Sequence, residues 1–186
     1  MSGYKFNRLS VMVIEENRHM LGLIAEILHG LGVRDVVPVT DTAAALQELN
    51  VTHADLIVTA LHMQPLDGIE FVRFARTSPE SPDKFVPIIM VTGHGTGRLV
   101  RLARDTGVTE FLAKPISAKG LYLRILEAIN KPRRFVRTRG FFGPDRRRRN
   151  APHDGPERRK NEPEAVGVDG VKIFAAAEPV AGFSTK

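Results

Sequence analysis

Apolar and polar residues follow a pattern along the first 130 residues that switches repeatedly between the periods of strands and helices. Short apolar runs rich in β-branched residues are typical of buried strands, and we predict strands at 9–14, 36–39, 54–60, 86–92 and 110–113. Apolar positions at helical spacing follow each run and predict helices that begin at or near Asn17, Asp41, Asp67, Gly97 and Ser117. Pro38 lacks a backbone donor, so we place the second strand at a sheet edge.

Alternation of strand and helix, repeated five times, predicts an α/β domain with a five-stranded parallel, doubly wound sheet. Sites in such sheets lie at the carboxyl ends of the strands. This rule directs attention to Glu15 and Glu16, to residues 60–62 and 92–94, and to Lys114. One polar group at a strand end is ordinary, but several that converge on one sheet edge indicate a site.

Composition limits the other classes of protein. The chain of 186 residues has no cysteine, which excludes disulfides, thiolate zinc sites and a cysteine nucleophile, and favours a cytoplasmic location. No apolar run approaches the roughly 20 residues of a membrane helix, so we expect no membrane association. The first residues carry no apolar stretch of the secretory kind.

The excess of positive over negative charge lies entirely in the last third of the chain. Through Asn130 there are 13 basic and 14 acidic residues, whereas from Lys131 onward there are 14 basic and 7 acidic ones. We therefore predict two parts, a folded domain at 1–131 and a mostly flexible, arginine-rich extension at 132–186. The extension contains two related units, GPDRR at 143–147 and GPERR at 155–159.

The strand ends carry a family pattern. An acidic pair, Glu15-Glu16, follows the first strand, Thr92-Gly93 ends the fourth, and Lys114-Pro115 follows the fifth, with Phe111 three residues before the lysine. Together with the segment DLIVTALHMQPLDGIEFVR, these residues make positions 8–130 resemble the CheY-like receiver domain of bacterial response regulators. The resemblance implies a flavodoxin-like fold, a role in two-component signal transduction, an aromatic switch at Phe111 and a cis Lys-Pro peptide.

The resemblance breaks at the centre of the expected pocket. Aligning Asp55 and Asp67 without a gap puts Ala60 where the family has its phosphoacceptor aspartate. A methyl group has no lone pair and cannot attack a phosphoryl donor. Thr59 should point to the opposite face of the strand. His62 is the nearby nucleophile that an ordinary phosphorelay regulator with another acceptor would need.

The pocket of the resembled family binds Mg²⁺ and contains a lysine, and this chain keeps the lysine but lacks one of the carboxylates. Mg²⁺ prefers near-octahedral oxygen ligands, and this pocket offers Glu15 and Glu16 without a third carboxylate. We therefore expect no cofactor and weak or absent Mg²⁺ binding. Lys114 is expected to neutralise Glu15 or Glu16, and the alternative is a pocket that senses a ligand or is permanently set. No nucleophile–base pair or phosphate loop indicates an enzyme, so we assign no catalytic residue.

Arginine dominates the basic residues of the extension, with ten Arg and four Lys from residue 131 on. Arginine forms planar, forked contacts with phosphates and guanine edges, and Phe135, Phe141 and Phe142 could offer stacking faces. Three alternatives stay open, namely a solvated tail, a docking peptide for a signalling protein, and a nucleotide or nucleic-acid site. The candidate binding residues are Arg133, Arg134, Arg137, Arg139, Asp145, Arg146, Arg147, Arg148, Arg149, Glu157, Arg158 and Arg159.

Among nucleotides, cyclic di-GMP suits the mixed arginine and carboxylate units, because arginines can hold its phosphates and a carboxylate can accept from guanine. The arrangement loosely resembles an arginine-rich, CheY-like subgroup that acts at the flagellar motor under cyclic di-GMP control. Long nucleic acid is a less favoured partner, since no helix-turn-helix or RNA-binding motif is visible. The sequence thus predicts a receiver-like signalling protein that acts by binding, cannot be phosphorylated at Ala60 and is not an enzyme.

Overall fold

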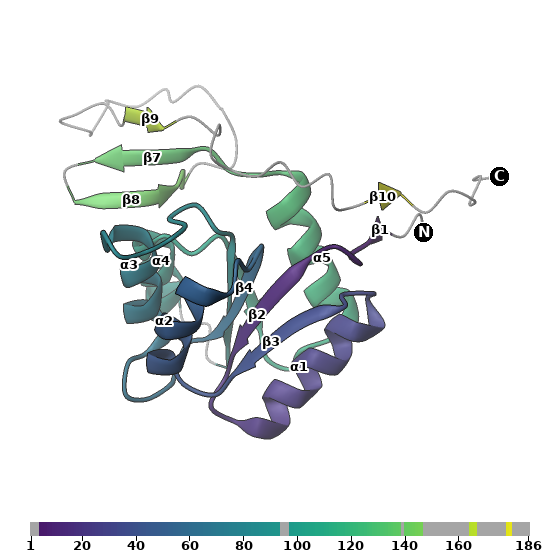
Figure 1. Cartoon of the computed structure of the whole chain (residues 1–186). Coiled ribbons are helices and arrows are strands. Elements are labelled where there is room, and N and C mark those ends of the chain that lie inside the picture. Colours follow the sequence, from purple (N-terminus) through teal and green to yellow (C-terminus); the bar gives the residue numbers. More distant parts are fainter. Residues whose placement is uncertain (1–3, 94–96, 139, 147–163, 167–177, 180–186) are drawn as a thin grey trace.

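The computed structural model describes residues 4–93, 97–138, 140–146, 164–166 and 178–179. Its centre is a five-stranded parallel sheet with the strand order β3-β2-β4-β5-β6 (Figure 1). This sheet confirms the predicted fold class. Its strands are β2 (Ser10–Ile14), β3 (Asp35–Val39), β4 (Leu56–Ala60), β5 (Ile88–Thr92) and β6 (Glu110–Ala113).

Five helices cover the two faces of the sheet: α1 (Arg18–Gly30), α2 (Thr42–Val51), α3 (Gly68–Thr77), α4 (Gly97–Thr106) and α5 (Ala118–Asn130). The apolar residues of α1 and α5 pack with those on one face of the sheet, and those of α2, α3 and α4 pack on the other. The predicted helix starts at Asn17, Asp41, Asp67 and Ser117 are confirmed, because the side chain of each accepts a backbone N–H of the first turn and caps the helix. Of the five helices, α4 has the fewest buried residues, namely Ala103 alone.

The predicted edge strand is also confirmed. β3 pairs with β2 through the register Val13↔Pro38 and ends the strand order of the sheet. Buried strands β4 and β5 lie at the centre, and all ten of their residues are buried.

The start of the extension is folded, which the sequence pattern did not indicate. Residues after α5 form an antiparallel hairpin of β7 (Phe135–Thr138) and β8 (Phe141–Pro144), to which β9 (Glu164–Val166) adds on the β7 side. β8 contacts α3 and α4, so the hairpin lies against the helical layer of the domain (Figure 1). A second short pairing joins β1 (Tyr4–Lys5) to β10 (Glu178–Pro179).

An aromatic cluster holds the hairpin to the domain. The ring of Phe85, from the loop before β5, lies 4.9 Å from that of Phe135 and 5.4 Å from that of Phe142, measured between centroids. Phe135 and Phe142 are buried, so they pack against the protein and do not present the stacking faces that we expected. The extension therefore begins as a packed part of the fold.

Within the described residues, no helix is both long and apolar enough to span a membrane.

Candidate functional site

Backbone hydrogen bonds align the carboxyl ends of the central strands, where the candidate residues lie. Leu61 N donates to Val91 O over 3.0 Å, and Lys114 N donates to Thr92 O over 2.8 Å. On the other side of β2, Glu15 N donates to Val39 O over 3.1 Å. The pocket residues predicted from β2, β4, β5 and the β6–α5 loop therefore share one edge of the sheet.

Glu15 and Lys114 form the central contact of this pocket. Lys114 Nζ lies 2.9 Å from Glu15 Oε2, and the Glu15 side chain is 4% exposed. Glu15 Oε1 also accepts the backbone N–H of Asn17 over 3.1 Å. Lys114 thus neutralises Glu15, one of the two partners that we expected.

Glu16 has a different role from Glu15. Its side chain is exposed, and Oε2 accepts the backbone N–H of Gln64 over 3.2 Å. This contact connects the start of α1 with the loop that follows β4. The two glutamates therefore point to different partners, one to the lysine and one to the loop.

Ala60 is the buried last residue of β4, and backbone surrounds it closely. The hydroxyl of Thr59 donates to Ala60 O over 3.1 Å, so it is engaged with the backbone. A Cβ at Gly68 would lie 2.1 Å from Ala60 O, which means that the first turn of α3 sits directly on this strand end. His62, two residues on, is exposed.

Thr92 and Phe111 complete the predicted pocket. Thr92 is buried at the end of β5, next to exposed Gly93. Phe111 is half-buried against the apolar layer beneath α2, α3 and α4. The Lys114–Pro115 peptide is cis, as the resemblance implied, and the Gln64–Pro65 peptide is also cis, which sequence reasoning missed.

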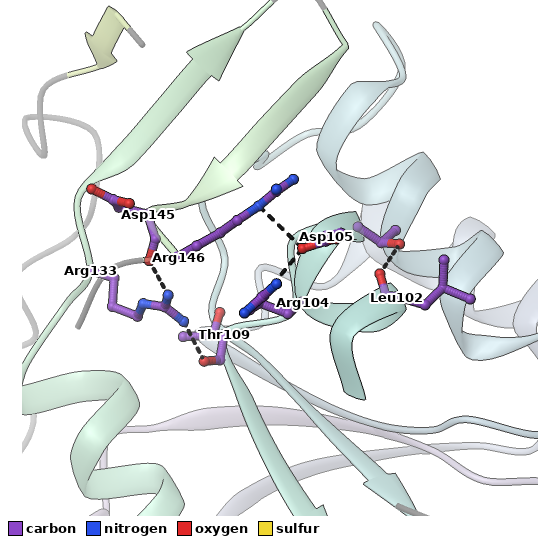
Figure 2. A network of polar contacts seen from close by, with 8 residues as sticks. Leu102, Arg104, Asp105, Thr109, Arg133, Asp145 and Arg146 are labelled. Carbon is purple, nitrogen blue, oxygen red and sulfur yellow. Dashed lines mark hydrogen bonds and ion pairs between the residues drawn. The ribbon is translucent and has the colours of Figure 1, made fainter. Parts of the chain in front are cut away.

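Two arginines of the extension are engaged within the protein (Figure 2). Arg133 Nη1 donates to Thr109 O over 3.2 Å, and its Nη2 donates to Asp145 O. Arg146 Nε lies 3.3 Å from Asp105 Oδ1 at the end of α4. Since Thr109 directly precedes β6, this network lies at the amino ends of the strands. The receiver-like pocket and these two arginines therefore lie at opposite ends of the sheet.

Of the other predicted binding residues of the extension, two arginines lie in the described part of the chain. Arg134 and Arg137 are exposed, and the Arg137 guanidinium lies 5.2 Å from the centroid of the Phe142 ring. The remaining candidates, which lie outside the described residues, are Arg139, Arg147, Arg148, Arg149, Glu157, Arg158 and Arg159.

Metal-binding capacity depends on clustered donors. Among the residues that the structure describes, no group of three or more His, Asp or Glu side chains is placed to hold a metal ion. At the pocket, the carboxylates present are those of Glu15 and Glu16.

Comparisons with known proteins agree with this architecture. Residues 11–126 match the family model of the response regulator receiver domain. The chemotaxis protein CheY of Pseudomonas aeruginosa (strain PAO1) is 26% identical over 117 residues, which are 63% of this chain and 93% of that protein. The transcriptional regulatory protein GlrR of Escherichia coli (strain K12) is 29% identical over 121 residues, 65% of this chain.

This chain spans only 26% of the length of GlrR. Among solved structures, the receiver domain of the sensor histidine kinase PA1611 from P. aeruginosa PAO1, with a magnesium ion in its active-site cleft, is similar with a TM-score of 0.56 and 27% identity. That likeness covers 64% of this chain and 94% of the other. From the family match over residues 11–126 and the shared sheet, the chain belongs to the response regulator receiver domain family of two-component signalling.

Proposed function

We propose that this receiver transmits signals by binding a signalling partner and does not accept a phosphoryl group in its pocket. The observation that carries the proposal is the methyl group of Ala60, which is buried at the end of β4 where the family pattern has its acceptor carboxylate. Phosphoryl transfer to protein needs a nucleophile with a free lone pair. Ala60 offers none.

The neighbours of Ala60 support the same conclusion. Thr59 is buried and its hydroxyl donates to Ala60 O, so it is engaged away from any donor in the pocket. His62 is exposed in the loop that follows β4. We therefore propose no alternative acceptor and no catalytic activity.

The donor set of the pocket fits Mg²⁺ poorly. Lys114 and the Asn17 N–H already occupy the two oxygens of Glu15, and Glu16 accepts from the loop after β4. Ala60 contributes no oxygen, whereas Mg²⁺ requires several oxygens in near-octahedral positions. The related PA1611 receiver has a magnesium ion in its cleft. For this chain we propose weak Mg²⁺ binding and no resident cofactor.

The extension is the second part of the proposal. Arg133 and Arg146 are engaged in contacts with the domain, whereas Arg137, in β7, and Arg134, directly before β7, are exposed. A folded hairpin with a few exposed arginines favours docking to a protein partner over tracking of a long polyanion. Cyclic di-GMP and nucleic acid are the alternative ligands. Calorimetry of the full chain with cyclic di-GMP and with a short DNA duplex separates them, because only the duplex predicts a steep loss of affinity with salt.

The central experiment is incubation of the full chain with acetyl phosphate and Mg²⁺, followed by intact-mass and peptide mass spectrometry. We expect no phosphoryl adduct on the natural chain or on His62→Gln. The matched variant Ala60→Asp restores a carboxylate and tests whether the donor is active. A phosphoryl adduct on the natural chain between residues 59 and 67 would refute the proposal.

A further inference from the structure

A cleft lies between the hairpin and the end of α3, away from the receiver pocket. Its volume is about 470 Å³, which is within the range of small-molecule sites. It combines cationic, hydroxyl and aromatic side chains from both the domain and the extension. The lining residues are Arg76, Thr77, Lys84, Arg137, Thr138, Gly140, Phe141 and Phe142.

Charge in this cleft has one sign. Arg76, Lys84 and Arg137 line it, and no Asp or Glu does. Among the described residues, no carboxylate lies within ion-pair distance of any of the three. A concave surface that is lined by cations and has apolar walls attracts anions and raises their local concentration.

Arg76 is the buried component of this positive field. Its side chain is fully enclosed, with Nε donating to Gly107 O and Nη1 to Lys84 O, each over 3.0 Å. Nη2 is buried and has no hydrogen-bond partner in the described part of the chain. Burial lowers the pKa of Arg76 to about 9, and the charge of Asp83 offsets this only partly. This guanidinium is desolvated, and its close partners are two carbonyl oxygens and the Phe135 ring 5.3 Å away, so a further negative charge near the cleft would stabilise it.

Arg137 supplies the accessible cation. Its guanidinium is exposed and lies 5.2 Å from the centroid of the Phe142 ring, which restricts its orientation. Lys84 approaches the same cleft from the loop before β5, so the two cations come from different parts of the protein. A second cavity, of about 630 Å³, shares Lys84, Arg137 and Phe142 and is also lined by Asp83, so the positive field is strongest on the side of the first cleft. These three residues therefore line both cavities, and each cavity is large enough for part of a ligand.

We propose that this cleft binds a small phosphorylated molecule, with its phosphate between Lys84 and Arg137 and its remaining part against the half-buried ring of Phe141. Arginine and lysine are the usual phosphate contacts in proteins, and the aromatic walls suit an organic group better than water. A phosphate in this position bridges the hairpin and the domain. The inference stands independently of whether Ala60 can be bypassed as an acceptor.

The test is calorimetric titration of the full chain with guanosine monophosphate, guanosine and inorganic phosphate. We expect saturable binding of the monophosphate and much weaker binding of guanosine. Arg137→Ala and Lys84→Ala should each weaken monophosphate binding about tenfold, the effect of losing one charged hydrogen bond. Arg134→Ala is the matched control, because Arg134 is an exposed arginine directly before the hairpin and outside the lining, and its loss should leave affinity unchanged.

Three outcomes would overturn the proposal. These are the absence of saturable binding by either phosphate-containing compound, equal affinity for guanosine and its monophosphate, and an equal loss on Arg134→Ala and Arg137→Ala. The last result would indicate general attraction of anions by the arginine-rich hairpin. Circular dichroism and urea unfolding of each variant establish that the substitutions leave the fold intact.

Discussion

Lys114 Nζ and Glu15 Oε2 lie 2.9 Å apart across the carboxyl ends of the sheet, and the glutamate is buried while the lysine side chain is 30% exposed. Removing the lysine leaves a buried carboxylate with one backbone partner. We expect Lys114→Met to lower the free energy of unfolding by about 1 to 3 kcal/mol, measured by urea denaturation.

The control for this change is Lys119→Met, at an exposed lysine of α5. The double variant Glu15→Gln with Lys114→Met should recover part of the loss, because it leaves no buried charge. Equal effects of Lys114→Met and Lys119→Met would show that the pair does not stabilise the pocket.

The close approach of Gly68 to Ala60 predicts that a side chain at Gly68 destabilises the protein. A Cβ at Gly68 would lie 2.1 Å from Ala60 O, a backbone atom that cannot rotate away. We expect Gly68→Ala to cost about 2 to 4 kcal/mol of unfolding free energy in urea. Gly22→Ala is the matched control, since Gly22 lies within α1 with nothing within 4 Å of its Cβ position. That change should stabilise the protein by about 0.5 to 1 kcal/mol.

A third prediction concerns the extent of the domain. The expected boundary after residue 131 separates the hairpin from the ring of Phe85 and from buried Arg76. A chain truncated after Lys131 exposes these groups, so we expect it to lose about 2 to 4 kcal/mol of unfolding free energy. Calorimetric and urea unfolding of residues 1–131 and of the full chain provide the comparison. An unchanged midpoint would mean that the hairpin adds nothing to the stability of the domain.

The hairpin itself allows its apolar and charged contacts to be compared. Phe142 is buried in the aromatic cluster, so Phe142→Ala should cost about 2 to 3 kcal/mol, and no more than removal of the whole hairpin. Arg146 and Asp105 form an ion pair whose side chains are 41% and 39% exposed. Arg146→Ala should therefore cost less than about 1 kcal/mol. If urea unfolding gave the reverse order, electrostatics would hold the hairpin.

The sheet, its caps and the pocket pair were predictable because their signals are local in sequence. An N-cap such as Asn17 acts within one turn, and parallel strands bring Glu15 and Lys114 to the same edge whatever the loops do. Sequence alone left the choice between Glu15 and Glu16 open, since it depends on side-chain direction. Phe111 as a switch stays a prediction.

The hairpin was missed because its strands are only four residues each and lie in a segment of the sequence that is rich in arginine. The signal was present, as Phe135–Thr138 and Phe141–Pro144 are separated by two residues that include Gly140. Burial of Arg76 could not be predicted at all. Its position at the end of α3 is typical of a solvated cation, and it is enclosed by Phe135 from a segment far along the chain.

Gly107 and Gly143 meet backbone to backbone, and a Cβ at Gly143 would lie 2.9 Å from Gly107 Cα. Gly107 also has φ +111°, which side chains rarely adopt, and a Cβ there would lie 3.0 Å from Arg76 Cγ. The packing of the hairpin on the domain therefore requires glycine, which has no side chain, at both Gly107 in the domain and Gly143 in the hairpin. If this extension were attached to another receiver, its hairpin could approach the domain in the same way only where that receiver has a glycine directly after α4.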